Sequence, residues 1–165
     1  MMWDTVTEAM SALYPQAQPW HVTYPAEGFE LQAASAYPAD GHWHFVSYGL
    51  GERHGFELTV RVVRGVEQSP PQWPFLLLNR VAGLAGLAAQ AGEPFEEGQW
   101  ADLGGPVTGH PHTDGPPSGL SVVILAADPQ LGDRFLQLVG VTTAEALAGE
   151  VDSDDPLLVT DPARA

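Results

Sequence analysis

The chain has 165 residues, of which 44% are hydrophobic, and it contains no cysteine. This length suits one domain with a substantial core, and the missing thiols exclude disulfides, zinc–thiolate sites and cysteine nucleophiles. The 21 acidic residues against six basic ones, all arginine, give a formal net charge of -15. We therefore expect no binding to nucleic acid or to an anionic membrane, and we expect a basic protein partner. A surface of this charge can also serve only to keep a protein in solution.

The beginning of the chain shows no targeting segment. Residues 1–14 include Asp4 and Glu8 but no basic residue, whereas a signal peptide begins with positive charge and continues with an apolar run. No window reaches the ~18 uninterrupted apolar residues of a membrane-spanning helix. These features predict a cytoplasmic protein.

Hydrophobic periodicity predicts a helix followed by strands in the first half of the chain. In residues 2–14, Val6, Met10 and Leu13 recur every three or four positions and would share one helical face. Strand-like runs follow at residues 30–37, 42–48 and 55–64. In the third run apolar and polar residues alternate, which predicts a strand buried on one face only.

The second half begins with the longest predicted helix. Pro74 suits its first position, and Gly92 and Pro94 mark its end. Two adjacent apolar stripes indicate that this helix lies largely buried across a sheet. Residues 93–119 are rich in Gly, Pro and acidic side chains, which predicts mostly loop with one short strand at 99–103.

The remaining pattern completes the fold class. It predicts strands at 120–126, 134–141 and 157–160, a helix at 142–148, and a loose tail at 161–165. Thr142 and Glu145 have the spacing of a helix capping box. Because several strands follow one another without intervening helices, we predict an α+β fold with a mixed or antiparallel sheet and helices packed mainly on one face.

Six short motifs resemble the Suppressor of fused family and occur in that family's order. They are HFVSYGL (44–50), GFELT (55–59), PPQWP (70–74), DPQL (128–131), FLQLVGVT (135–142) and LLVTD (157–161). The resemblance lies within residues 30–161, so we predict one family-like domain over 1–165, with residues 1–20 as an N-terminal helix and linker.

The resemblance implies an α+β fold that binds other proteins, with no catalytic centre and no cofactor. Single-domain bacterial members of this family are regarded as immunity proteins of polymorphic toxin systems, each neutralising a cognate toxin. Animal members carry a longer loop between the SYGL-like and FELT-like motifs, and that loop contributes to gripping the partner. Here the connection is only residues 51–54, so the animal contact residues do not transfer.

Two histidine pairs offer an alternative function. His42 and His44 would share one face of a strand, and His110 with His112 forms a second pair. Together they could supply four ligands to the metal of a metal-dependent enzyme. The spacing fits no zincin motif, because no HExxH occurs. A third alternative is an intracellular scaffold without a toxin partner.

The partner-binding residues predicted from the sequence are aromatic or acidic. An acidic run before Pro156 lacks the glycine and the final glutamate of a calcium loop, so it is either a solvated turn or part of an acidic docking patch. The predicted contact residues are Tyr48, Glu52, Asp114, Asp152, Asp154 and Asp155.

Overall fold

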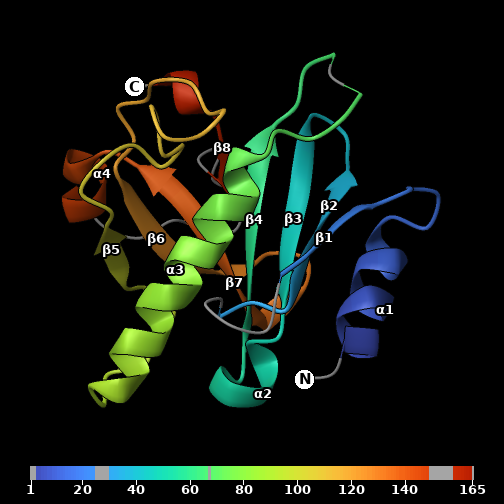
Figure 1. The fold of residues 1–165 in the computed structure, drawn as a ribbon, viewed down its shortest axis with the longest axis horizontal. Coiled ribbons are helices and arrows are strands. Elements are labelled where there is room, and N and C mark those ends of the chain that lie inside the picture. Colours follow the sequence, from blue (N-terminus) through green and yellow to red (C-terminus); the bar gives the residue numbers. More distant parts are fainter. Residues whose placement is uncertain (1–2, 25–29, 67, 149–157, 165) are drawn as a thin grey trace.

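The computed structural model describes residues 3–24, 30–66, 68–148 and 158–164, which form a sheet with helices on both faces (Figure 1). The strands are β1 Trp20–Thr23, β2 Ala33–Pro38, β3 His42–Tyr48, β4 Glu57–Val63, β5 Trp100–Asp102, β6 Val122–Asp128, β7 Gly132–Val141 and β8 Val159–Thr160. The helices are α1 Trp3–Leu13, α2 Gly51–His54, α3 Trp73–Gln90 and α4 Thr143–Ala148, with a 3₁₀ turn at Pro162–Arg164. In the described part of the chain, no helix has the length and apolar character needed to cross a bilayer.

The sheet is mixed, as predicted. Its strands follow the order β1-β2-β3-β4-β7-β6-β5, and the pairs within β1–β4 and within β5–β7 are antiparallel. The two halves join where residues 57–60 of β4 run parallel to residues 135–138 of β7. Beyond that point β8 takes over, pairing in parallel with residues 61–62 of β4.

Helix α3 crosses one face of the sheet (Figure 1). Proline stands in its first turn, as the sequence predicted. Leu78 and Val81 of α3 are fully buried and belong to the same core cluster as Phe45 of β3 and Leu58 of β4. The prediction of a largely buried helix on the sheet is therefore confirmed.

Helices α1 and α4 lie against the opposite face. Val6 and Met10 of α1 pack with Tyr37 and Val46, while Ala146 of α4 packs in a separate cluster with β6 and β7. The prediction of helices mainly on one face therefore holds for the long helix α3, whereas α1 and α4 cover the other face. The reason is that the central strands bury side chains on both faces, and each buried face needs its own packing layer.

The polar alternation of β4 does not face solvent. Glu57, Thr59 and Arg61 retain only 1%, 0% and 4% of their accessible surface, so the prediction of a strand buried on one face is wrong. Strand β4 lies between β3 and β7, and its second face is covered as well. Each of these polar groups must therefore find a hydrogen-bonding partner inside the protein.

Glu57 meets this requirement by holding the turn after β3. Its carboxylate accepts hydrogen bonds from Ser47 Oγ at 2.7 Å and from three successive backbone N–H groups, residues 49–51, at 3.2, 3.2 and 2.9 Å. Burial raises the pKa of this carboxyl, and the four hydrogen bonds oppose that shift. Residues 51–54, expected as a short connection, form the helical turn α2 at this point. The SYGL and FELT motifs thus flank one turn, and the Glu57 carboxylate of the second motif holds the end of the first in place.

Two segments carry structure that the sequence analysis did not predict. Strand β1 adds an edge strand next to β2. The tail, predicted to be loose, contains the 3₁₀ turn Pro162–Arg164, where Arg164 Nη1 lies 2.6 Å from Glu145 Oε2. Glu145 and Thr142 also exchange the two capping-box hydrogen bonds, at 2.9 and 3.2 Å, so the capping prediction is confirmed.

We predict that Gly49→Ala destabilises the protein more than Gly41→Ala. Both glycines have positive φ, 107° and 79°, so both alanines incur about 1–2 kcal/mol of backbone strain. A Cβ at Gly49 would meet Gln32 Cγ at 2.7 Å, whereas a Cβ at Gly41 meets nothing within 4 Å. In urea unfolding we expect an additional loss of about 1–3 kcal/mol for Gly49→Ala. Equal losses for the two variants would contradict a sterically constrained turn.

Candidate functional site

Polar side chains from several motifs meet at one buried carboxylate, that of Asp128, which is 1% exposed. Its Oδ2 accepts hydrogen bonds from His44 Nε2 at 3.0 Å, Thr59 Oγ1 at 2.9 Å and Arg61 Nη1 at 3.0 Å. Its Oδ1 accepts from Arg61 Nη2 at 3.1 Å and from two backbone N–H groups of the following turn at 3.0 and 3.1 Å. Every acceptor position of this carboxylate is therefore used.

Arg61 extends these contacts across the sheet. Besides its two-pronged pairing with Asp128, it donates to Gln130 Oε1 at 2.9 Å and to Gln137 Oε1. Gln137 Nε2 in turn donates to the backbone carbonyl of Leu158 at 2.6 Å. We call His44, Thr59, Arg61, Asp128, Gln130 and Gln137 the Asp128 network. It joins β3, β4, the end of β6, β7 and the residue before β8, and none of its buried side-chain nitrogen or oxygen atoms lacks a hydrogen-bond partner.

Both ring nitrogens of His44 are engaged, which fixes its tautomer. Nε2 donates to Asp128, so Nδ1 accepts from the Tyr14 hydroxyl at 2.7 Å. Burial lowers the pKa of His44 to about 4, although the hydrogen bond to Asp128 opposes this shift. Burial alone would raise the pKa of Asp128, but the hydrogen bonds from His44 and Arg61 and the charge of Arg61 hold it well below its ordinary value. The Asp128 network thus holds one carboxylate, one guanidinium and a neutral imidazole.

The two histidine pairs do not form a metal site. Within the described ranges, which include all four histidines, no group of three or more His, Asp or Glu could hold a metal ion. His44 is fully buried with both nitrogens occupied, while His110 Nδ1 lies 3.2 Å from the carbonyl oxygen of Gly115 in its own loop. The four-histidine arrangement considered from the sequence is therefore not formed.

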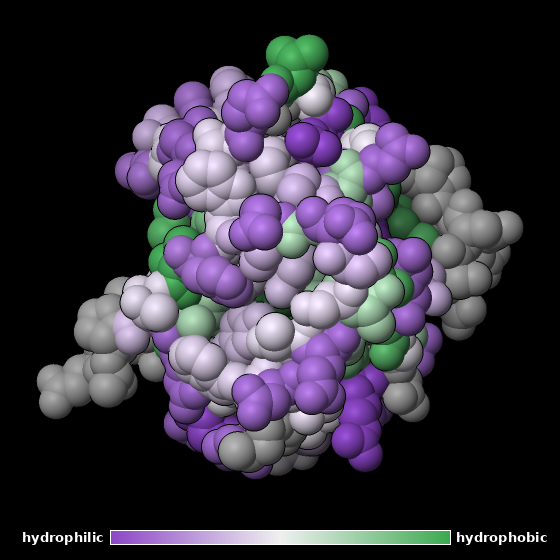
Figure 2. Space-filling view, turned by 90° about the vertical axis from the view of Figure 1, so that its right-hand side faces the viewer, coloured by the Kyte–Doolittle hydropathy of each residue, from purple (hydrophilic) through white to green (hydrophobic). Residues whose placement is uncertain are grey.

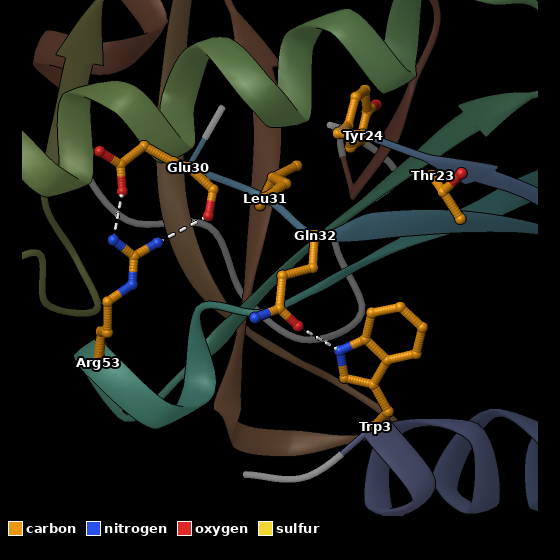
Figure 3. A pocket seen from close by; sticks show the side chains of 7 residues that line it. All are labelled: Trp3, Thr23, Tyr24, Glu30, Leu31, Gln32 and Arg53. Atoms are coloured by element: carbon orange, nitrogen blue, oxygen red, sulfur yellow. Dashed lines mark hydrogen bonds and ion pairs between the residues drawn. The ribbon is translucent and has the colours of Figure 1, made fainter. Parts of the chain in front are cut away.

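A surface groove of about 560 Å³ lies where α1, α2 and the segment leading into β2 meet (Figure 3). We call it the α1–α2 groove. In Figure 3 the side chain of Gln32 lies between Trp3 of α1 and Arg53 of α2. Its lining residues are Trp3, Thr23, Tyr24, Glu30, Leu31, Gln32 and Arg53.

Hydrogen bonds fix the walls of the α1–α2 groove. Trp3 Nε1 donates to Gln32 Oε1 at 2.7 Å, although the Trp3 side chain remains 43% exposed. Arg53 Nη2 donates to the carbonyl oxygen of Glu30 at 2.7 Å, and its Nη1 lies 3.0 Å from the Glu30 carboxylate. A Cβ at Gly86 of α3 would lie 3.0 Å from Glu30 Oε1, so the glycine makes room for this carboxylate. The groove presents an exposed indole and a half-exposed guanidinium, side chains that are enriched at interface hot spots.

Two of the predicted contact residues lie beside lining residues of the α1–α2 groove but do not line it themselves. Tyr48 is 3% exposed and packs beneath Trp3, with 5.2 Å between ring centroids. In this arrangement Tyr48 supports the exposed indole. Glu52 is exposed on α2, next to Arg53.

The other predicted contact residues are not brought to this groove. Asp114 lies near the start of α3, where its Oδ2 accepts a hydrogen bond from the Gln72 N–H at 2.9 Å. Asp152, Asp154 and Asp155 lie outside the described residues.

Sequence reasoning missed both the Asp128 network and the groove residues Trp3 and Arg53. One signal for the network was available, because Thr59 and Arg61 stand in a strand flanked by other strand-like runs, where polar residues signal internal partners. Asp128 looked like an ordinary turn residue before proline. The groove had no sequence signal, since its walls come from residues 3, 23–24, 30–32 and 53.

The displaced pKa of His44 predicts acid sensitivity between pH 6.5 and 4. The folded protein binds this proton only near pH 4, whereas the unfolded chain binds it near 6.5. Stability from this group is therefore complete above pH 6.5 and is lost as the pH falls towards 4, by at most about 3 kcal/mol. We expect His44→Gln, which keeps an N–H donor for Asp128, to remove this part of the pH dependence.

The measurement is the free energy of unfolding in urea for both proteins from pH 4 to 7. Subtracting the two curves cancels the other carboxylates and histidines, including His42, whose pKa burial also lowers. The wild-type curve should fall more steeply with acid than the variant's. Parallel curves would show that His44 titrates in the folded state as it does in the unfolded chain.

Comparisons with known proteins agree with this fold. A structure of the Sufu–Fu complex superposes with a TM-score of 0.77 at 23% identity, covering 98% of this chain and 90% of that one. Drosophila Suppressor of fused gives 0.77 at 24% identity over 97% of this chain, which spans only 49% of that longer chain. A Suppressor of fused homologue from Neisseria gonorrhoeae gives 0.65 at 18% identity, covering 88% and 80%. No curated protein sequence matches the chain.

The sequence model of the Suppressor of fused protein (SUFU) family matches residues 23–165. This span begins within β1 and includes every strand from β2 onward, together with the Asp128 network. Helix α1, which carries Trp3 of the groove, precedes it. Since the match covers most of the chain, the protein belongs to the Suppressor of fused family.

Proposed function

We propose that this protein is a non-catalytic protein-binding module that acts in the cytoplasm as an immunity protein, neutralising a basic toxin domain. Membership of the Suppressor of fused family supports the binding role. The Sufu–Fu structure is a protein–protein complex formed by a relative with the same fold. The observation that carries the choice of a basic partner is the net charge of -15.

The distribution of charge strengthens this argument. Arginines 53, 61 and 164 are held by carboxylates of the same chain, and Arg64 lies over the Trp43 ring at 4.8 Å. In the described ranges, many exposed carboxylates have no ion-pair partner; among them are Asp4, Glu8, Asp40, Glu52, Glu93, Glu96, Glu97, Asp102 and Asp114. Three of the six arginines are thus paired with carboxylates of the same chain, while the acidic groups named above stay free to attract and steer a basic partner.

The proposed mechanism is steric occlusion of the toxin over a standard-size interface. The α1–α2 groove is our proposed anchor, with Trp3 and Arg53 as contacts, Tyr48 as support and Glu52 on its rim. The side of the molecule that carries α1 and β1 is mostly polar or intermediate in hydropathy, with hydrophobic atoms in small separate areas (Figure 2). Recognition there would rest on individual anchors and charge. Asp114, Asp152, Asp154 and Asp155 remain proposed acidic contacts outside this groove.

Co-expression tests the immunity role. A toxin encoded beside this gene should arrest growth alone, and this protein should restore growth and co-elute with the toxin in size-exclusion chromatography. Binding should be fast and salt-sensitive, because charge steering weakens as ions screen it. If the protein does not restore growth and forms no complex with the toxin, the immunity role is wrong. A complex with a non-toxic protein instead would favour a scaffold.

The groove is tested by Trp3→Ala against Trp20→Ala. Both tryptophans are similarly exposed, 43% and 48%, but only Trp3 lines the groove. We expect Trp3→Ala to weaken toxin binding at least about tenfold, in the range of hot-spot residues, with little change for Trp20→Ala. Equal effects of the two substitutions would remove the groove as the anchor while leaving the immunity role intact.

A further inference from the structure

Strand β5 forms one margin of the sheet, opposite β1 (Figure 1). It pairs with β6 through Leu125 N–H to Gln99 O at 2.8 Å and Leu103 N–H to Ser121 O at 2.9 Å. Because antiparallel strands alternate the direction of their backbone groups, residues 99, 101 and 103 face β6. The backbone groups of Trp100 and Asp102 therefore point outward, and no described residue pairs with them.

This open edge carries one large apolar side chain. Trp100 is 46% exposed, and it stands opposite Ile124 of β6 in the register. Natural sheets usually protect their edges, because an exposed edge strand recruits another strand. An exposed aromatic beside unpaired backbone groups suits the addition of an extended segment from a partner.

The exposed carboxylates along the β5 edge determine which kind of segment can bind there. Glu96, Glu97 and Asp102 are exposed along the edge and the turn that leads into it, and no basic residue occurs from 91 to 109. A second copy of this edge would bring like charges together, so self-pairing is disfavoured. A lysine- or arginine-rich strand instead meets opposite charge, and a cation over the Trp100 ring gains further stabilisation.

A hollow on the α3 side of the same edge supports this choice. It measures about 500 Å³, and its lining includes Glu93, Phe95 and Glu96 together with Ala88 of α3. It lies at the carboxyl end of α3, which has no basic residue in its last turn and where the helix dipole is negative. The aliphatic stem of an arginine or lysine could cover Phe95 while its charge lies between the two glutamates.

The other margin of the sheet lacks these features. Strand β1 also exposes a tryptophan, Trp20, but its four residues, Trp20–Thr23, include a histidine and no carboxylate. Both margins of the sheet therefore expose a tryptophan on an edge strand, but only β5 has carboxylates on the strand and in the turn that leads into it.

We propose that the β5 edge is a docking site for an extended basic segment of the partner, which adds to the sheet beside Trp100 and Asp102. This inference rests on the proposed function in one respect: it takes the partner to be basic. It assigns to that partner a lysine- or arginine-rich strand, bound through backbone hydrogen bonds and through side chains alternating between Asp102 and the hollow lined by Glu93 and Glu96.

The direct test uses the intact protein and an amidated nine-residue peptide in which lysine alternates with valine. At 150 mM salt we expect hydrogen exchange of the Trp100 and Asp102 amides to slow at least tenfold when the peptide saturates the protein. The same peptide N-methylated on the N–H groups that would face β5 should lose this protection, and a glutamate–valine peptide should not bind. Peptide binding without protection of these amides, or equal binding of the methylated peptide, would overturn strand addition.

Two double variants distinguish the effect of this surface from the effect of the overall net charge. Glu96→Lys/Glu97→Lys and Asp4→Lys/Glu8→Lys change the net charge equally, and all four residues are exposed. The first pair should weaken peptide and toxin binding at least tenfold, and the second pair should weaken peptide binding less than about twofold, because screening at this salt acts over about 8 Å. Equal effects, or self-association that the basic peptide does not disrupt, would overturn the docking site. A toxin complex insensitive to the first pair would overturn the site while leaving the proposed function standing.

Discussion

The structure depends on a single buried carboxylate, that of Asp128. Six hydrogen bonds converge on it from β3, β4 and the turn after β6. Arg61 then carries the connection through Gln137 to the backbone of Leu158, and His44 carries it to Tyr14 beyond α1. Desolvating such a pair is costly, and the cost is offset only when every donor and acceptor is used. In the Asp128 network no buried side-chain nitrogen or oxygen lacks a hydrogen-bond partner, and its geometry therefore specifies how these strands fit together.

The same network separates two apolar clusters on the α1 and α4 face. One gathers around Val6, Met10 and Tyr37, and the other around Ile124, Val139 and Ala146. The main core under α3 lies on the other side of the sheet. Since apolar contacts are tolerant of small slips while bidentate hydrogen bonds are not, the polar centre supplies the register that the apolar clusters do not.

Much of the fold could be predicted from the sequence, because local patterns report local structure. The periodicity of α1 and α3 and the run of β3 follow directly from residue spacing. Burial of Thr59 and Arg61 was signalled only by the strand-like runs on either side, because its cause, the pairing of β4 with β7, arises only in the folded chain. The helical turn α2 was missed because its stability comes from the carboxylate of Glu57 on the next strand. The α1–α2 groove was missed for a similar reason, since Trp3 and Arg53 become neighbours only in the folded chain.

Paired and unpaired charges occupy different parts of the molecule. Three of its six arginines are held by its own carboxylates, one of them at the centre of the sheet. The free carboxylates remain on the surface, around the groove rim and along the β5 edge. The proposed role as an acidic binding module for a basic protein rests on this division: the core fixes the shape, and the exterior supplies the charge that would select the partner.

The most direct test of this account is the unfolding free energy of Asp128→Asn, compared with Asp40→Asn. Asp40 is exposed, so its substitution should change stability by no more than about 0.5 kcal/mol. Asp128→Asn leaves Arg61 buried without its counter-charge and should cost about 3–5 kcal/mol or prevent folding. A loss below about 1 kcal/mol would contradict the central place given to this carboxylate.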